Sequence, residues 1–292
     1  MPLSSLNLQA FVAVARSGSF SRAAKLLHLT QSAVSQRLLN LERELATSLI
    51  VRDPAGLRLT AGGHELLRYC QLKDSLEEDV LMALDASRSR LAGTIRIATF
   101  SSLTCAIVMP ALAPLLNDHP LINIELFTRE IGQLSDMLLR SEADLVLTHE
   151  PSQRQELVAE EVGCESYVLV TSTRDAARQD VFLDHDPDDQ MTTRFLAAQK
   201  KGGSRAIRRN FLDDVHALMT GVELGWGRAV MPRHLITGRR GVKVMAGFRP
   251  LLVPVYLQYV RQSYYAKLHT ATRTALSEGI ANLIAKASEA ER

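Results

Sequence analysis

The segment 30–42 (TQSAVSQRLLNLE) constrains the fold of this chain more than any other. Val34, Leu38 and Leu41 recur at spacings of four and three, the period of a helix with one face in a core. The opposite face carries amides, hydroxyls and one guanidinium, on Gln31, Ser32, Ser35, Gln36, Arg37 and Asn40. Such side chains can form hydrogen bonds with base edges and phosphates. The same pattern also suits an ordinary solvated helix, so the neighbouring segments decide between the two interpretations.

Two shorter helices are expected before this one. Apolar residues at i, i+3, i+4 and i+7 predict an amphipathic helix over 6–16. Gly18 follows, at the position where a left-handed residue ends a helix, and a short Ala-rich helix is expected over 21–27. After a tight turn, Thr30 can cap the third helix. This succession predicts a helix-turn-helix, in which 30–42 is the recognition helix.

A β-hairpin is expected next to the recognition helix. Two short extended runs, 49–52 and 57–60, bracket a turn that contains Pro and Gly. Arg52 and Arg58 would make this hairpin a wing against a phosphate backbone. Residues 1–68 contain eight Lys and Arg but four Asp and Glu, a net charge of +4, whereas the whole chain has +2. The positive charge is therefore concentrated where a polyanion would bind.

Specific motifs cover residues 6–63 almost without gaps. They are Leu8-x-x-Phe11, Gly18-Ser19-Phe20-Ser21-x-Ala23-Ala24-x-x-Leu27, Thr30-Gln31-Ser32-Ala33-Val34-Ser35, Leu41-Glu42-x-x-Leu45, Leu49-x-x-Arg52 and Leu59-Thr60-x-x-Gly63. Together they resemble the DNA-binding head of LysR-type transcriptional regulators. Ala46 and Ile50 replace the usual Gly and Phe, and Ser32 a common Pro, which affects packing near the wing rather than base contacts. We therefore expect a double-stranded DNA operator to contact Gln31, Ser32, Ser35, Gln36, Arg37, Asn40, Arg52 and Arg58.

A long helix is expected over 61–91, where no proline occurs and apolar residues recur every three or four positions. Leu76 and Val80 lie in the middle of this apolar row. The row could pack on its own chain or against a second copy. Dimerisation is the better fit, because one helix-turn-helix reads only one half-site. The family resemblance implies the same, a homodimer or a dimer of dimers.

The rest of the chain predicts an α/β regulatory region. Strands over 94–98, 122–126 and 144–148 alternate with helices over 102–117 and 131–140, which indicates a parallel sheet with right-handed crossovers. Further strands are expected over 167–171, 181–183, 228–231 and 255–259, and helices over 213–223 and 264–287. This order resembles the two-lobed, periplasmic-binding-protein-like effector domain of LysR regulators.

The expected fold class is thus α/β, with an N-terminal winged helix-turn-helix, a long linker helix and a two-lobed effector domain. The expected boundaries are 1–60 for the DNA-binding domain, 61–91 for the linker and 92–292 for the regulatory domain. Lobe one would comprise about 92–162 plus 266–292, and lobe two about 163–265. By the resemblance, the last helix returns to lobe one.

An effector site is expected where strands of an open sheet end. Ser101, Ser102 and Thr104 begin the helix after the first strand, and Thr148 ends the third strand. Backbone N–H groups at a helix start, together with hydroxyls, favour a carboxylate or another small anion. The alternative is that these hydroxyls only cap the helix.

The acidic run 184–189 (DHDPDD) has two interpretations. It is either a solvated loop or, as in the arginine- and lysine-responsive branch of the family that it resembles, part of an effector site. Segments 30–37 and 110–114 resemble that branch as well. A basic amino acid would then place its carboxylate at Ser101 and Ser102 and its side-chain cation at an aspartate.

Cysteine usage leaves one further alternative. Cys70, Cys105 and Cys164 are widely spaced, with no CxxC motif, which favours a reducing compartment and argues against a structural zinc. Cys105 lies in the first turns of a helix, where a thiolate is stabilised. Because some family members sense peroxide through a cysteine, a redox sensor acting through Cys105 is a rival interpretation.

No membrane, cofactor or catalytic role is expected. The sequence has no basic segment ahead of an apolar run, and its apolar stretch 105–116 is broken by prolines and too short to span a bilayer. We therefore expect a cytoplasmic protein. No Ser/His/Asp set, Gly-x-Gly-x-x-Gly or metal-spaced histidines are present, so no catalytic residue, cofactor or metal is expected. The rival class is an enzyme whose α/β domain acts on a small carboxylate.

Overall fold

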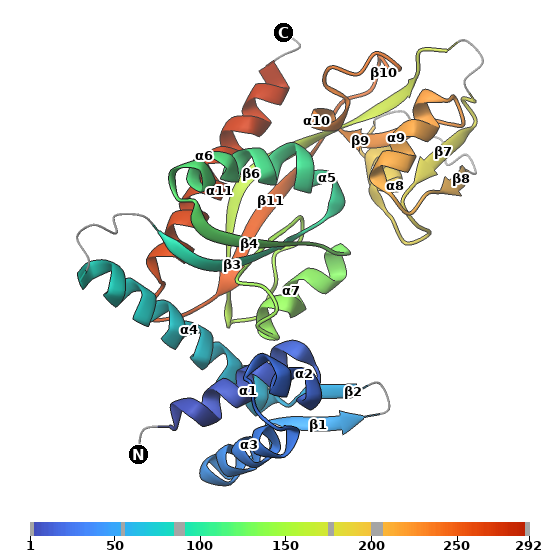
Figure 1. Cartoon of the computed structure of the whole chain (residues 1–292). Helices are drawn as coiled ribbons and strands as arrows, with labels where there is room; N and C mark the ends of the chain where they lie inside the picture. Colours follow the sequence, from blue (N-terminus) through green and yellow to red (C-terminus); the bar gives the residue numbers. More distant parts are fainter. Residues whose placement is uncertain (1–2, 54–55, 85–90, 175–177, 200–206, 290–292) are drawn as a thin grey trace. The chain divides into compact units, whose positions relative to one another are not determined.

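The computed structural model describes residues 3–53, 56–84, 91–174, 178–199 and 207–289 (Figure 1). The chain divides into two compact units. The first comprises Met1–Gly93 with Leu139–Glu142, and the second comprises Thr94–Leu138 with Ala143–Arg292. In the described part of the chain, no helix is long and apolar enough to cross a membrane.

The first unit contains the predicted winged helix-turn-helix. Its elements are α1 (Ser5–Ser17), α2 (Phe20–Leu26), α3 (Gln31–Leu45), β1 (Ile50–Asp53), β2 (Gly56–Leu59) and α4 (Ala61–Leu84). Gly18 ends α1 in the left-handed conformation, at φ 61°. Thr30 caps α3, since its Oγ1 accepts a hydrogen bond of 3.1 Å from the backbone N–H of Ala33. β1 and β2 pair antiparallel, as predicted, and residues 54–55 of the expected turn lie outside the described residues.

The core of this unit explains its sequence pattern. Phe11, Val34 and Leu41 are fully buried, so the apolar row of α3 packs against α1 and not toward solvent. Gly63, in the first turn of α4, lies against the backbone of Leu49, where a Cβ would lie 2.2 Å from the Leu49 carbonyl oxygen. No side chain fits at that distance, which accounts for the glycine of the last motif.

The long helix α4 has a buried first half and an exposed apolar second half. Leu66 and Leu67 join the core of the first unit. Farther along, Leu76, Val80 and Leu84 are 39%, 55% and 79% exposed. The expected extension to residue 91 crosses 85–90, which lie outside the described residues. Among the described residues, Leu76 and Val80 in the middle of the predicted apolar row are therefore exposed.

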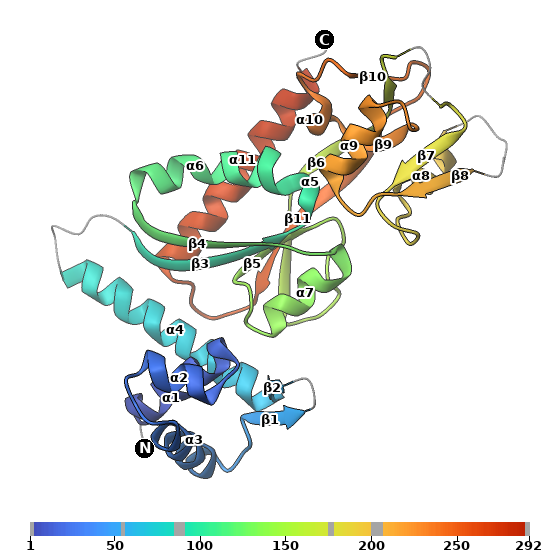
Figure 2. The same ribbon diagram turned by 45° about the vertical axis from the view of Figure 1, so that its right-hand side comes forward.

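A mixed seven-stranded sheet forms the second unit, in the order β10-β6-β11-β5-β3-β4, with β9 also paired to β6. The strands are β3 (Ala92–Thr99), β4 (Leu121–Thr128), β5 (Leu145–Thr148), β6 (Leu157–Ser172), β9 (Ala229–Pro232), β10 (Val242–Val244) and β11 (Leu251–Val260). β3 and β5 are parallel, as predicted, whereas β11 runs antiparallel to both β5 and β6. The two long strands β6 and β11 thus connect β5, β3 and β4 on one side of the sheet with β9 and β10 on the other (Figure 2).

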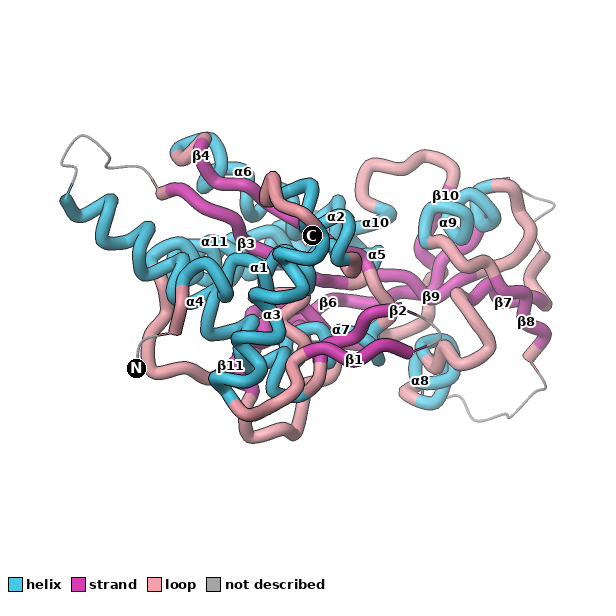
Figure 3. The backbone as a smooth tube through the Cα atoms, turned by 60° about the horizontal axis from the view of Figure 1, so that its bottom comes forward, coloured by secondary structure: helices cyan, strands magenta, loops and turns pink. Residues whose placement is uncertain are grey.

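Helices cover this sheet, and a smaller sheet lies beside it. The helices are α5 (Ser101–Leu103), the π-helix η1 (Thr104–Val108), α6 (Met109–Asp118), α7 (Ile131–Leu139), α8 (Met191–Ala197), α9 (Val215–Glu223), α10 (Arg233–Ile236) and α11 (Lys267–Glu289). The smaller sheet pairs β7 (Val181–Asp184) in parallel with β8 (Arg208–Phe211), seen side by side in Figure 3. In Figure 2, α11 runs alongside α6. They approach so closely that a Cβ on Gly279 would lie 2.6 Å from the Cβ of Ala111.

Several elements differ from the sequence prediction. The helix expected over 102–117 contains the π-turn η1. β6 begins at Leu157 rather than at residue 167, because its first half pairs with β11. The short elements α8, β8, α10 and β10 are absent from the sequence prediction, since three to seven residues carry little periodic signal.

Candidate DNA-binding surface and effector site

The predicted base-reading residues lie on the face of α3 that the core does not use. Gln31, Ser32, Gln36 and Asn40 are exposed, and Ser35 and Arg37 are half-buried. Neighbouring side chains orient the amides: Gln36 Nε2 donates to Asn40 Oδ1 at 2.9 Å, and Ser21 Oγ donates to Gln31 Oε1 at 3.3 Å. The first turns of α3 therefore present an array of hydrogen-bonding groups held in place before any partner binds.

The hairpin supplies the predicted cations. Arg52 on β1 and Arg58 on β2 are both exposed. The Arg52 guanidinium lies 5.4 Å from the centre of the Phe20 ring, so β1 is close to the start of α2. A groove of about 310 Å³ lies between these elements, lined by Gly18, Ser19, Phe20, Ser21, Gln31, Arg52, Gly56 and Leu57. Hydroxyls and one guanidinium in a groove beside the recognition helix suit a backbone phosphate.

This groove leads to a prediction about salt dependence. Replacing Arg52 with alanine should weaken binding to operator and random DNA by similar factors, because an interaction with phosphate carries no sequence information. The slope of log affinity against log salt should flatten by about 0.9 for each phosphate that the protein no longer neutralises. Fluorescence anisotropy titrations over a salt series measure this slope. The control is Lys243→Ala, which removes an exposed cation from β10 and should leave the slope unchanged. An unchanged slope in Arg52→Ala would exclude contact between the hairpin and the DNA phosphates.

The predicted effector residues lie around the start of α5. Among the described residues no side chain caps this helix start, and Ser101 and Thr104 are half-buried. Thr104 Oγ1 donates to the Phe100 carbonyl oxygen at 3.1 Å and lies 3.2 Å from Thr128 Oγ1. Ser102 is buried. Of the three, Ser101 has a partly accessible hydroxyl for which the structure gives no capping role within the described residues.

Thr148 is more deeply placed than the effector hypothesis requires. It ends β5, is 1% exposed, and its Oγ1 accepts a hydrogen bond of 3.2 Å from the Glu150 backbone N–H. Its hydroxyl therefore supports the turn after β5, a structural role that needs no ligand. Thr99, at the end of the adjacent strand β3, has a buried Oγ1 without a hydrogen-bond partner among the described residues.

A buried polar cluster behind α5 is a feature that the sequence analysis does not predict. His149 Nε2 and Glu165 Oε2 are 2.5 Å apart, and His234 Nδ1 lies 3.4 Å from Glu165 Oε1. His234 Nε2 is 3.1 Å from the Ser102 carbonyl oxygen. Burial raises the pKa of Tyr167, which is hydrogen-bonded to the Ser102 side chain, well above its usual range. The start of α5 is therefore coupled through hydrogen bonds to β6 and α10.

The histidines of this cluster are far apart in the sequence, where they look like scattered structural or exposed residues. The structure brings His149 and His234 together on one carboxylate. Glu165 is the available signal, because a charged residue inside an apolar strand must find partners.

The acidic run 184–189 is an ordered turn and not simply a solvated loop. Asp184 is buried and paired with the Thr192 hydroxyl and the Arg209 guanidinium. Burial raises the pKa of its carboxyl group. Asp186 Oδ1 accepts hydrogen bonds from the backbone N–H groups of Asp188 and Asp189, at 2.6 and 2.9 Å. Most of these carboxylates thus stabilise their own loop.

The three cysteines are free thiols in different environments. Cys70 is buried, and burial raises its pKa to about 11. Cys164 on β6 is half-buried, and burial raises its pKa as well. Cys105 is exposed on the π-helix η1, with no disulfide partner among the described residues.

Comparison with known proteins gives matches along nearly the whole chain. Residues 6–64 match the family model "Bacterial regulatory helix-turn-helix protein, lysR family", and residues 88–280 match "LysR substrate binding domain". A relative described as a probable RuBisCO transcriptional regulator of Emiliania huxleyi is 36% identical over 148 residues, 50% of this chain and 47% of that protein. The chain thus spans about half the length of this relative, and 39% of the length of a putative transcriptional regulator of Pseudomonas aeruginosa.

Two solved structures share the fold of the full chain. ArgP from Mycobacterium tuberculosis superimposes with a TM-score of 0.74 at 24% identity, covering 96% of this chain and 99% of ArgP. LysG from Corynebacterium glutamicum, solved with arginine bound as effector, gives a TM-score of 0.70 at 18% identity, covering 95% and 98% of the two chains.

Proposed function

The chain belongs to the LysR family of regulatory helix-turn-helix proteins, and from this premise we propose that it is a transcriptional regulator whose operator binding responds to a small molecule. It is a cytoplasmic homodimer or dimer of dimers that binds a pseudo-palindromic double-stranded operator. A ligand in the regulatory domain changes the relative arrangement of the DNA-binding heads. Such control requires that the ligand bind two arrangements with different affinity.

The observation that carries this proposal is the division of α3 into two faces. Its apolar face is fully used by the core, at Val34, Leu38 and Leu41. Its polar face, beginning with Gln31, is exposed next to a hairpin that carries two arginines. A solvated helix would not require this combination, whereas a helix in a major groove beside a phosphate-binding wing does.

Base readout by α3 gives a direct test. Gln31→Ala or Gln36→Ala should each lower operator affinity by about 1–3 kcal/mol, roughly 5- to 150-fold, and relax preference at one base position. The measurement is anisotropy with a panel of single-base operator variants. Gln9→Ala removes the same amide from the exposed side of α1 and should bind as wild type does. If all three variants keep wild-type affinity and base preference, α3 does not read the bases.

The effector proposed here is a small carboxylate, with a basic amino acid as its most specific form. The uncapped start of α5 and the Ser101 hydroxyl favour an anion, and Ser102, Thr104 and Thr148 are the further residues proposed for this site. The acidic run 184–189 is where we propose that a cationic side chain of the ligand binds, although most of its carboxylates also stabilise their own loop. The arginine complex of LysG is consistent with this class.

The proposed functions belong to different parts of the chain. We propose 1–60 as the DNA-binding domain, 61–91 as the dimerisation linker and 92–292 as the two-lobed regulatory domain. The relatives are regulators, not enzymes, which leaves the enzyme interpretation without support. A thiol sensor is not favoured either, since the part of the chain that the structure describes offers Cys105 no disulfide partner.

A further inference from the structure

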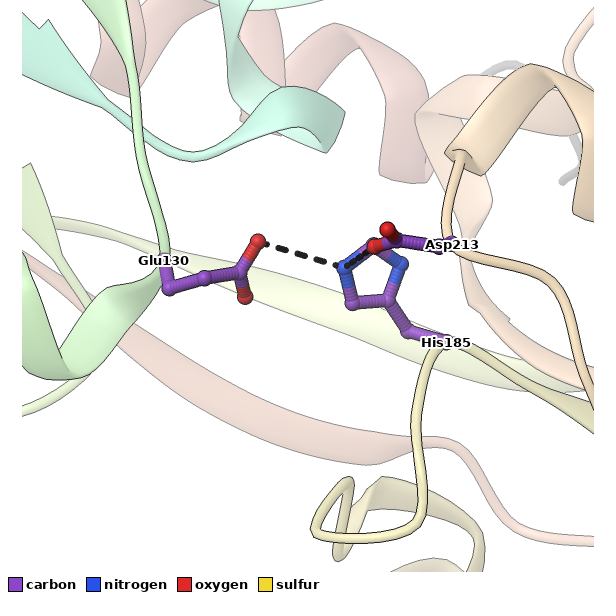
Figure 4. Close-up of side chains that lie close together, drawn as sticks. All are labelled: Glu130, His185 and Asp213. Carbon is purple, nitrogen blue, oxygen red and sulfur yellow. Dashed lines mark hydrogen bonds and ion pairs between the residues drawn. The ribbon is translucent and has the colours of Figure 1, made fainter.

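We propose that Glu130, His185 and Asp213 bind a divalent transition-metal ion of the zinc class. The three side chains converge in the second unit from separate elements, as Figure 4 shows. Glu130 immediately precedes α7, His185 follows β7, and Asp213 lies between β8 and α9. Its ligands are not the residues proposed for the effector's carboxylate at the start of α5, although His185 belongs to the acidic run 184–189. The proposed regulatory function does not require the ion.

The distances between the donor atoms are those expected for ligands of one metal ion. His185 Nε2 lies 3.4 Å from Glu130 Oε1 and 3.3 Å from Asp213 Oδ1, and all three donor atoms lie within 4.8 Å of one another. Charge-assisted N–H···O bonds are shorter, about 2.7–2.9 Å, so each of these two contacts is at most a weak or shared hydrogen bond. Metal–ligand bonds of about 2.0–2.2 Å in a tetrahedron place neighbouring ligand atoms about 3.4 Å apart.

Backbone hydrogen bonds hold the segments that carry the three ligands. The Gln133 N–H donates to the Glu130 carbonyl oxygen at 2.9 Å. The His185 N–H donates to Asp189 Oδ2 at 3.3 Å. The neighbour of Asp213, Asp214, caps α9 by accepting a hydrogen bond of 2.7 Å from the Ala217 N–H. His185 is half-buried, and the side chains of Glu130 and Asp213 are exposed. Because both carboxylates are exposed, they can reorient around an ion.

The donor set selects the kind of ion. An imidazole nitrogen with two carboxylates suits Zn²⁺ and related transition metals, whereas Mg²⁺ and Ca²⁺ prefer oxygen ligands alone. The two carboxylates balance the charge of a divalent ion. Three protein ligands also leave a fourth tetrahedral position for water or an external ligand. Because Glu130 lies on the β4–α7 connection and the other two ligands flank the smaller sheet, the ion would join these two parts of the unit.

Metal binding can be measured directly on the full chain. After chelator treatment, calorimetric titration with zinc chloride should give one ion per chain. His185→Ala, Glu130→Gln and Asp213→Asn should each weaken this binding by at least about tenfold, since even outer partners of ligands contribute that much. The visible absorption of tetrahedral Co²⁺, titrated in parallel, should depend on the same three residues.

Three control variants make the test specific. His216→Ala removes an exposed imidazole from α9, Glu150→Gln an exposed carboxylate, and Cys105→Ser the exposed thiol, and all three should bind zinc as wild type does. Equal unfolding temperatures in metal-free buffer establish that each ligand variant is folded. The proposal is overturned if the wild type binds no stoichiometric zinc, if His185→Ala binds it equally well, or if Cys105→Ser abolishes binding.

Discussion

Replacing Leu76 and Val80 together with aspartate should convert the protein to a monomer and reduce operator affinity by about 100-fold or more, because two linked heads lose their shared effective concentration. Both side chains lie in the exposed apolar row of α4. Each apolar side chain buried against a partner helix contributes about 1.5–3 kcal/mol, and a carboxylate in its place would be desolvated. Random-DNA affinity should fall much less, because a single head still binds phosphates.

Sedimentation equilibrium and anisotropy titrations measure these two effects. Leu76→Met with Val80→Ile keeps the row apolar at the same two positions and should remain dimeric, with operator affinity close to wild type. If the aspartate variant remains a dimer, the exposed row of α4 is not the dimer interface, and the proposed spacing of the heads must come from another surface.

Ser101→Trp should abolish the response to effector and leave effector-free operator binding intact. The indole would occupy the space in front of the uncapped start of α5, where the ligand's carboxylate is proposed to bind. A thermal-shift screen of amino acids and small carboxylates first identifies the ligand, since a ligand at 100 times its dissociation constant adds about 2.7 kcal/mol of stability. Titration of that ligand in an operator-binding assay then measures the response.

Two further variants show whether a lost response comes from the proposed site or from the added indole itself. Ser102→Ala should weaken the response several-fold, because one neutral hydrogen bond contributes about 0.5–1.5 kcal/mol. Ser263→Trp places the same indole on an exposed loop of the second unit and should respond as wild type does. A full response in Ser101→Trp would place the effector elsewhere in the regulatory domain.

The winged helix-turn-helix can be predicted almost residue by residue because its determinants are local. Gly18 ends α1, and Thr30 caps α3. The apolar row that includes Val34 and Leu38 sets the buried face of α3, and each of these signals involves residues close together in the sequence. The parallel pairing of β3 and β5 is also predictable, since strand and helix alternate along the chain there. The antiparallel continuation through β6 and β11 is not, because it joins segments about a hundred residues apart.

The buried cluster and the proposed metal site escape sequence prediction for the same reason. Glu165 meets His149 and His234 only after β5, β6 and α10 are packed together. Glu130 and His185 are separated by 55 residues, so neither belongs to a spaced ligand motif. Individual polar residues in these segments are visible in the sequence, but their convergence depends on tertiary structure.

Selection from a random DNA library would show whether the polar face of α3 reads a specific DNA sequence. The full chain should enrich one pseudo-palindromic sequence with two half-sites centred about one helical turn, or a multiple of it, apart. The double variant Gln31→Ala with Gln36→Ala should lose that preference at defined base positions while retaining general DNA binding. If the wild type enriches no sequence, or the double variant enriches the same sequence, the polar face of α3 does not read bases.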